Sequence, residues 1–434
     1  MTGGPAHRLY RRSVTRADGA PAGGAGVSTT DVERGGDSAT SRTAPEDRWA
    51  RLRAGARDAA PALAVYVAIR VIGLVALAIY ARSHGHAAFG RLDTYDAPRL
   101  LRLADRGYDP LIPGYLHGKP TTSNIAFFPL FPLVVRVVAA LPLVSTLAAG
   151  YLVTAVSGLV AAVGLDRFGR RMVGRADGAA AGRLGGLVFV ALWATWPHSV
   201  VLDMPYTEAL YVAFTVWSML ALLDGRWLTA GVLCLFAGAT RSLGVALAGA
   251  IALAALVSVV RAVREHHRVP WRPVAGAVLA PLGVLGYWGY QWARTGRPDA
   301  WFWVQSTEWR SSFDGGAYTL RTITKSLTQG NPPVIVVCSL VVIASIALVV
   351  ALAVGRAPLA VVAYAAFAVV LTFGTENYMN SKSRFLLCAF PLVVPLARAL
   401  VRLPRPLIVG VVVAVTIVVA WYNAYVLVLW PASP

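Results

Sequence analysis

Two aspartates in one short polar segment are the side chains best suited to catalysis in this sequence. Asp93 and Asp96 lie in RLDTYDAPRLLRLADRGYD (residues 91–109), after an apolar segment of membrane-spanning length and before the apolar, proline-rich NIAFFPLFPL (124–133). A carboxylate at a membrane surface can take the proton of a hydroxyl that attacks a lipid-borne substrate. We therefore expect Asp96 to be a general base. Asp93 is its helper or alternative, on the same face if this segment is helical. The competing interpretation is a solvated loop acid or a helix N-cap.

Cations at the membrane surface are the natural partners of such a base. If the attack is on the anomeric carbon of a sugar phosphate, the departing phosphate needs Arg or Lys beside it. Lys and Arg total 40, but the only lysines are Lys119, Lys325 and Lys382. Lys382 with Arg384 is the best phosphate pair, and interfacial anchoring is the competing interpretation. Arg241, between two short apolar segments, is either in an ion pair within the membrane or a snorkelling side chain.

Three further polar side chains are candidates for binding the substrate. Tyr206 and Glu208 belong to DMPYTE (203–208), where Glu208 either hydrogen-bonds substrate hydroxyls or is a first-turn acid favoured by the helix dipole. Gln305 lies in WFWVQSTEW (301–309), whose tryptophans either stack on a sugar face or anchor the chain at the interface.

Composition identifies the class of protein. Hydrophobic residues are 57% of the 434 and charged residues only 14%, which exceeds what the core of a soluble domain needs. The net charge of +19 comes from short basic runs between apolar segments, as in loops that orient membrane helices, so we do not expect nucleic-acid binding. The three cysteines lie within apolar segments and indicate neither disulfides nor zinc.

The apolar segments predict an all-α polytopic membrane protein, a bundle of about eleven transmembrane helices. Residues 1–59 have the composition of a disordered tail, which the basic run before the first span should keep in the cytoplasm. Residues 60–434 form the membrane domain. The expected spans are 60–80, 145–165, 184–202, 205–223, 227–241, 244–260, 274–292, 334–354, 357–374, 384–401 and 407–430.

The segment Asn124–Leu143 is predicted to lie in the membrane interface instead of crossing. It contains three prolines and Arg136, and counting it as a span would put the Arg-rich stretch 166–175 outside. The predicted external loops are then 81–144, 293–333 and 375–384.

Four sequence blocks resemble one family of membrane enzymes. They are Tyr95-Asp96 with Leu103-Ala104-Asp105-Arg106-Gly107-Tyr108; Asn124 to Leu133; Pro205-Tyr206-Thr207-Glu208 with Gly225-Arg226-Trp227 and Thr240-Arg241-Ser242; and Ser383-Arg384-Phe385 with Phe390-Pro391-Leu392. Their order resembles the PIG-V-like branch of the GT-C membrane mannosyltransferases, relatives of the enzyme that adds the second mannose to glycosylphosphatidylinositol anchors. Two positions depart from the family pattern: Tyr95 stands for its Trp, and Arg99-Leu100 for its aromatic pair.

The resemblance implies an inverting mannosyltransferase with a GT-C-like fold. Its implied donor is a polyprenyl-phosphate mannose, its implied acceptor a glycolipid, polysaccharide or protein, and its reaction site the non-cytoplasmic face. Another polyprenyl-phosphate sugar is an open alternative. A lipid-linked glycan flippase or transporter is the alternative of another class, which should place ionisable residues along several mid-membrane helices. His84, His86 and His117 lack metal-ligand spacing, so no metal or other cofactor is predicted and a metal requirement is left open.

Overall fold

A computed structural model describes residues 45–109, 115–116, 119–120 and 123–434. The chain divides into two units, Met1–Leu52 and Arg53–Pro434, and the second contains the candidate site and all helices except the first residues of α1. The described part is α-helical except for two paired two-residue strands, β1 (Tyr115–Leu116) and β2 (Lys119–Pro120). The predicted all-α class is therefore confirmed.

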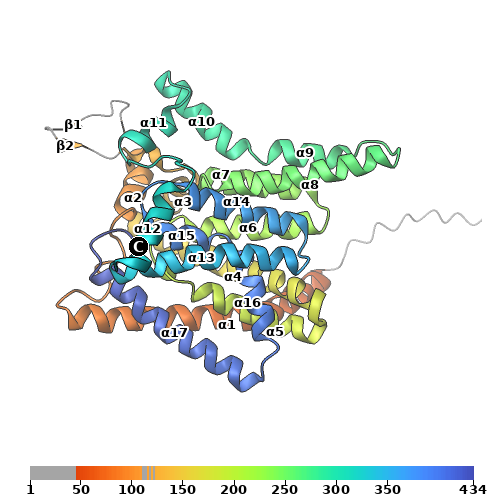
Figure 1. The fold of residues 1–434 in the computed structure, drawn as a ribbon, viewed down its shortest axis with the longest axis horizontal. Coiled ribbons are helices and arrows are strands. Elements are labelled where there is room, and N and C mark those ends of the chain that lie inside the picture. The colour runs from red at the N-terminus through yellow and green to blue at the C-terminus, as the bar shows by residue number, and fades with distance from the viewer. Residues whose placement is uncertain (1–44, 110–114, 117–118, 121–122) are drawn as a thin grey trace, which may run out of the picture. The chain divides into compact units, whose positions relative to one another are not determined.

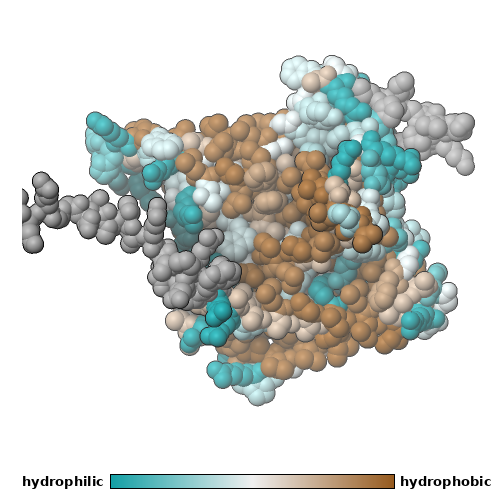
Figure 2. All heavy atoms as spheres, turned by 180° about the vertical axis from the view of Figure 1, so that it is seen from behind, coloured by the Kyte–Doolittle hydropathy of each residue, from teal (hydrophilic) through white to brown (hydrophobic). Residues whose placement is uncertain are grey.

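Five helices are long and apolar enough to cross a membrane by length and composition. They are α1 (Pro45–Ser83, of which Arg53–Ser83 qualifies), α4 (Thr146–Asp177), α8 (Gly244–Arg264), α13 (Pro333–Val354) and α17 (Arg405–Val428). In four of them, α1, α8, α13 and α17, a third or less of the most apolar window is buried inside the protein. Figure 2 shows apolar residues across the middle of one face and hydrophilic residues gathered towards its two ends. These helices suit a membrane protein, because side chains left exposed within the bilayer should be apolar.

The other predicted spans correspond to shorter or broken helices. Four are single helices of 14 to 16 residues, namely α5 (Ala179–Ala194), α6 (Glu208–Leu223), α7 (Trp227–Thr240) and α14 (Leu359–Gly374). Segment 184–202 is not one continuous helix, because α5 ends before Pro197 and the 3-10 helix η2 (Ser199–Leu202) follows. The total of eleven crossings stays a prediction.

Two predicted spans are broken at prolines. Segment 274–292 divides into α9 (Trp271–Leu279) and α10 (Leu282–Thr295) at Pro281. Segment 384–401 divides into α15 (Lys382–Leu387), η4 (Phe390–Leu392) and α16 (Val393–Leu400), with a bend of 82°. The bend turns α15 away from the direction of α16, so that Arg384 lies on a short helix preceded by η3 (Met379–Ser381).

The segment predicted to lie in the interface forms η1 (Asn124–Ala126) and the ten-residue helix α3 (Leu130–Ala139). Ten residues extend about 15 Å, half the thickness of a bilayer core, which supports the interfacial prediction. α3 packs with α2 (Ala97–Arg106) and α4 through a small apolar cluster that includes Leu100, Phe131 and Val153. This packing fixes α2, and with it Asp96 at its N-terminus.

Short helices also occupy the second predicted external loop, 293–333, as α11 (Ala300–Thr307) and α12 (Ala317–Thr328). In Figure 1, α2, α11 and α12 lie at one end of the helices, whereas the α4–α5 and α8–α9 connections lie at the other. The three loops predicted to be external therefore belong to one end of the unit Arg53–Pro434.

The first helix begins before the predicted first span, and the assignment of residues 1–59 to a cytoplasmic tail stays a prediction. Residues 1–44 lie outside the described residues, but α1 begins at Pro45 and not near residue 60. The stretch 49–60 is rich in Ala and Arg, two strong helix formers, which extends the first helix beyond its apolar part.

Candidate active site

A cavity of about 660 Å³ lies at the end of the helices where the three predicted loops meet. Its walls include residues of all three loops and of the N-terminal ends of α6 and α8. The predicted site residues that line it are Asp96, Tyr206, Glu208, Arg241, Gln305, Lys382 and Arg384. Asp93 is not among its lining residues. The fold thus brings together side chains that lie up to 288 positions apart in the chain.

Asp96 occupies the N-cap position of α2, but its side chain makes no capping hydrogen bond. Its Oδ2 instead accepts a hydrogen bond of 3.0 Å from Arg384 Nη1, and its backbone N–H donates to Tyr206 Oη at 3.1 Å. The N-cap interpretation therefore fails for the Asp96 carboxylate. The preceding residue, Tyr95, has φ 61°, a left-handed conformation that costs a non-glycine residue about 1–3 kcal/mol.

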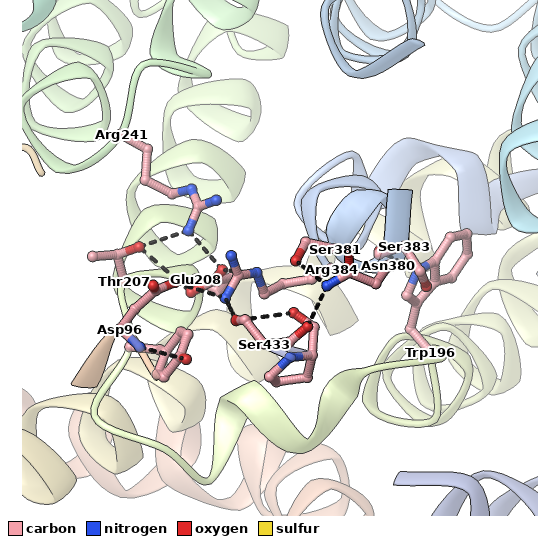
Figure 3. Close-up of polar contacts among 12 residues, drawn as sticks. Asp96, Trp196, Thr207, Glu208, Arg241, Asn380, Ser381, Ser383, Arg384 and Ser433 are labelled. Atoms are coloured by element: carbon pink, nitrogen blue, oxygen red, sulfur yellow. Dashed lines mark hydrogen bonds and ion pairs between the residues drawn. The ribbon is translucent and has the colours of Figure 1, made fainter. Parts of the chain in front are cut away.

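Glu208 pairs with two arginines at the start of α6. Its Oε1 lies 2.6 Å from Arg241 Nη1 and 3.4 Å from Arg384 Nε, and Glu208 has no exposed surface. Arg241 Nη1 also donates to Thr207 Oγ1 at 2.6 Å. Figure 3 shows these side chains converging from separate elements. Arg241 is therefore in an ion pair and is not a snorkelling side chain.

The four charges alternate along the network Arg241–Glu208–Arg384–Asp96. Two carboxylates balance two guanidinium groups, which makes the burial of each charge tolerable. Aromatic rings complete the shell: the Arg384 guanidinium lies 5.3 Å from the Tyr206 ring centroid and 5.1 Å from that of Phe385. Tyr206 thus contacts both the Asp96 backbone and Arg384, so it helps to hold these two residues in position.

Lys382 lines the same cavity but has other partners. Its Nζ donates to the backbone oxygens of Thr372 and Thr375, each at 2.6 Å, at the C-terminal end of α14. A lysine ammonium has three donors, so one is left for a ligand. Lys382 and Arg384 are therefore not an equivalent pair: the first binds a helix end and the second binds two carboxylates.

The tryptophans near Gln305 have a role that sequence reasoning missed. Trp301 Nε1 donates to Ala126 O at 3.3 Å, and Trp309 Nε1 donates to Ser123 O at 3.2 Å. These two bonds hold residues 123–126 against α11 and the residues that follow it. Both tryptophans also line the cavity, so stacking on a sugar face stays a prediction. No hydrogen bond of the Gln305 side chain occurs among the described residues, which leaves its amide available to the cavity.

Other lining residues were not predicted. Thr207 could have been found, because it lies within the same DMPYTE stretch as Glu208. Ser433 and Tyr378 could not, since isolated Ser and Tyr residues carry no signal in the sequence. Residue His117 lies outside the described residues, and within them no group of three His, Cys, Asp or Glu side chains is arranged to bind a metal.

A second buried ion pair lies outside the cavity. Arg70, near the middle of α1, lies 3.2 Å from Asp203 Oδ2 and donates to Ser199 O at 2.7 Å. It faces protein and not lipid, as an arginine at that depth should.

The comparisons with known proteins give similarity to solved structures only. No known family matches the chain, and no curated protein does either. The chain is similar to ArnT from Cupriavidus metallidurans in the apo state (17% identity, TM-score 0.46, covering 80% of this chain and 61% of ArnT). It is similar to the same protein bound to undecaprenyl phosphate (17% identity, TM-score 0.44, covering 80% of this chain and 62% of ArnT). The chain therefore spans about three fifths of the length of ArnT.

Proposed function

We propose that this protein is an inverting membrane glycosyltransferase that moves mannose from a polyprenyl-phosphate donor to an acceptor outside the cytoplasmic membrane. One observation carries the proposal. Each of the four sequence blocks that resemble GT-C mannosyltransferases contributes to the wall of the same cavity, through Asp96, through Phe127 and Phe128, through Glu208 and Arg241, and through Arg384. Unrelated apolar motifs scattered over a membrane protein have no reason to converge in this way.

The charges of the cavity fit the proposed reaction. The acceptor hydroxyl attacks the anomeric carbon, its proton goes to the Asp96 carboxylate, and the bond from that carbon to the phosphate oxygen breaks with its electrons leaving on the polyprenyl phosphate. A single displacement inverts the anomeric configuration. Arg384 and Arg241 are the cations that would stabilise the departing phosphate, because a planar guanidinium suits two phosphate oxygens.

The ion-pair network adds a condition to this mechanism. Without a substrate, Arg384 Nη1 is bonded to Asp96 Oδ2. An oxygen atom held in this bond is turned towards Arg384 and not towards an acceptor hydroxyl. A phosphate that takes over the Arg384 contact would replace one anion by another and release Asp96 towards the acceptor. Donor binding would thus prepare the base.

The distribution of arginines supports an external site. Arginines gather around the α4–α5 and α8–α9 connections. The first group lies in the last turns of α4 and the start of α5 (Arg167, Arg170, Arg171, Arg175 and Arg183), and the second lies at the end of α8, in the connection and at the start of α9 (Arg261, Arg264, Arg268 and Arg272). In Figure 1 these two connections lie at the end opposite to α2, α11 and α12. Since Arg-rich loops stay in the cytoplasm, the cavity end would face outward and residues 1–44 would lie inside.

Transfer from purified donors is the test. The protein in lipid nanodiscs should transfer radiolabelled mannose from polyprenyl-phosphate mannose to an acceptor in membrane extracts of the organism that produces it. The anomeric carbon of the product should have the inverted configuration. Polyprenyl-phosphate glucose, galactose and arabinose tested in parallel distinguish mannose from another donor sugar. Glycolipid and polysaccharide profiles of cells with and without the gene identify the acceptor. No transfer from any of these donors would refute the proposal.

A further inference from the structure

A short segment after α17, residues Trp430–Ser433, contacts both the loop that contains Asp96 and the segment that contains Arg384. Tyr95 Oη donates to Trp430 O at 2.9 Å. At the other end, Asn380 Nδ2 donates to Ser433 O at 2.6 Å, and Arg384 Nη1 donates to Ser433 Oγ at 3.1 Å. Figure 3 shows Ser433 between Arg384 and Asn380. We propose that this segment, here called the strap, is a positioning element that fixes Asp96 relative to Arg384. The proposal rests on the function proposed above.

The loop before Asp96 depends on the strap for its conformation. Tyr95 is in the left-handed region with φ 61°, and such a residue stays there only when surrounding contacts impose it. The bond to Trp430 O is one such contact. A second bond, from Arg91 Nε to Leu427 O at 3.1 Å, joins the same loop to the end of α17. Leu92 and Ala97 pack with Leu427 in one apolar cluster, so the whole loop rests on this end of α17.

Arg384 depends on the strap in a different way. It belongs to α15, a helix of six residues, which has few helical hydrogen bonds to hold it in place. Arg384 Nη1 bonds to both Asp96 Oδ2 and Ser433 Oγ. Because the guanidinium is planar, two acceptors on one of its nitrogens define both the position and the plane of the group. Ser433 is thus, with Asp96 and Glu208, one of the contacts that orient Arg384.

A substitution at Asn380 tests the positioning role of the strap without changing a residue that lines the cavity. Ser433 lines the cavity, so a substitution there changes the cavity wall as well as the strap. Asn380 is not among the lining residues, yet its amide bonds to the carbonyl oxygen of Ser433. Asn380 Nδ2 also donates to Ser381 Oγ at 3.4 Å, and Ser381 lines the cavity, so an effect of Asn380→Leu on turnover is assigned to the strap only when hydrogen exchange of the loop before Asp96 changes with it. Catalytic groups displaced by as little as 1 Å can lose about 100-fold in rate, so a loosened strap has a measurable consequence.

The test combines amide hydrogen exchange with transfer kinetics in nanodiscs. The variants are Asn380→Leu, Ser433→Ala, Ser433→Thr and Tyr95→Phe. Ser345→Ala is the control, since Ser345 is also buried and its Oγ bonds only within α13, to Val341 O. Loss of one hydrogen bond should slow turnover by about 3- to 10-fold in Asn380→Leu, Ser433→Ala and Tyr95→Phe. Ser433→Thr keeps the hydroxyl and should retain most of the turnover, and Ser345→Ala should match the wild type.

Amide hydrogen exchange tests whether the strap holds the loop before Asp96, independently of any sugar transfer. Asn380→Leu should speed exchange of the amides of residues 94–97, which belong to a different part of the chain, because the strap transmits the change from Ser433 to Trp430. Unchanged exchange at 94–97 would overturn the proposal that the strap couples the two segments. Faster exchange with unchanged turnover would overturn its positioning role. If the wild type transfers no sugar at all, the proposed function fails, while the exchange result still decides whether the strap couples the two segments.

A double-mutant cycle adds an independent criterion. Tyr95→Phe and Asn380→Leu change opposite ends of the strap, at residues with no mutual hydrogen bond in the described structure. If both act by loosening it, the double variant should lose less turnover than the product of the single losses. Independent multiplication of the two losses would contradict a shared element.

Discussion

Arg384 Nη1 lies 3.0 Å from Asp96 Oδ2, across 288 positions of sequence, and Arg384 Nε lies 3.4 Å from Glu208 Oε1. One guanidinium therefore bridges the two carboxylates of the cavity. Both contacts are largely shielded from solvent, since the Arg384 side chain is 8% exposed and that of Asp96 is 15% exposed. Substitutions of Glu208 and of Arg384 should therefore have different effects.

Glu208 should be essential for the stability of the site. Glu208→Gln leaves Arg241 and Arg384 close together without a compensating charge, and breaking a buried ion pair in this way costs about 3–5 kcal/mol. The midpoint of thermal unfolding in detergent should fall clearly. The control is Asp177→Asn, which breaks the pair with the exposed Arg402 and should change stability by about 1 kcal/mol or less. Adding Arg241→Gln to Glu208→Gln should recover part of the loss; an unchanged midpoint for Glu208→Gln would contradict the network.

Arg384 and Lys382 should differ in what they control. Arg384→Gln removes a charged donor from the proposed phosphate site, so donor use should weaken by about 1–3 kcal/mol while acceptor affinity changes much less. Lys382→Gln should mainly lower stability, because its ammonium bonds to two backbone oxygens of α14. Initial rates against donor concentration for Arg384→Gln, Arg384→Trp and Lys382→Gln make the comparison. Wild-type donor dependence in Arg384→Trp would contradict a phosphate-binding role for Arg384, because Trp has no positive charge.

The orientation in the membrane can be tested with single cysteines. In a protein lacking Cys234, Cys338 and Cys388, a cysteine at the exposed Thr328, in the α12 end of the second predicted external loop, should react with a membrane-impermeant thiol reagent in intact cells. A cysteine at the exposed His266, between α8 and α9, should react only after the membrane is opened. The reverse pattern would place the cavity in the cytoplasm.

Residue types and their order predicted much of the site. A carboxylate in a polar loop, cations at helix ends and an acid at a helix start are visible in a sequence because few charges occur near apolar segments. Asp96, Glu208, Arg241 and Arg384 were all predicted as site residues, and they form one network. Their roles in a reaction remain proposals. Asp93 was predicted as a partner of Asp96, yet it does not line the cavity.

Contacts between distant segments were not predictable. Hydropathy treats 274–292 and 384–401 as continuous spans, whereas Pro281 and Pro391 break them, and only the break brings Arg384 to the cavity. The two backbone acceptors of Lys382 and the bond from Arg384 to Ser433 depend on tertiary geometry. A single sequence contains no signal for such contacts, because any serine or carbonyl could serve.

The most direct test of the account is the turnover of Asp96→Asn beside that of Asp93→Asn, with radiolabelled polyprenyl-phosphate mannose as the donor. The asparagine at 96 keeps the size of the side chain but cannot accept a proton, so turnover per folded protein should fall by roughly 100-fold or more while donor binding is retained. Asp93→Asn should stay within about 3-fold of wild type, because its side chain does not line the cavity. Near-wild-type turnover in Asp96→Asn, or a greater loss in Asp93→Asn, would contradict the assignment of Asp96 as the base.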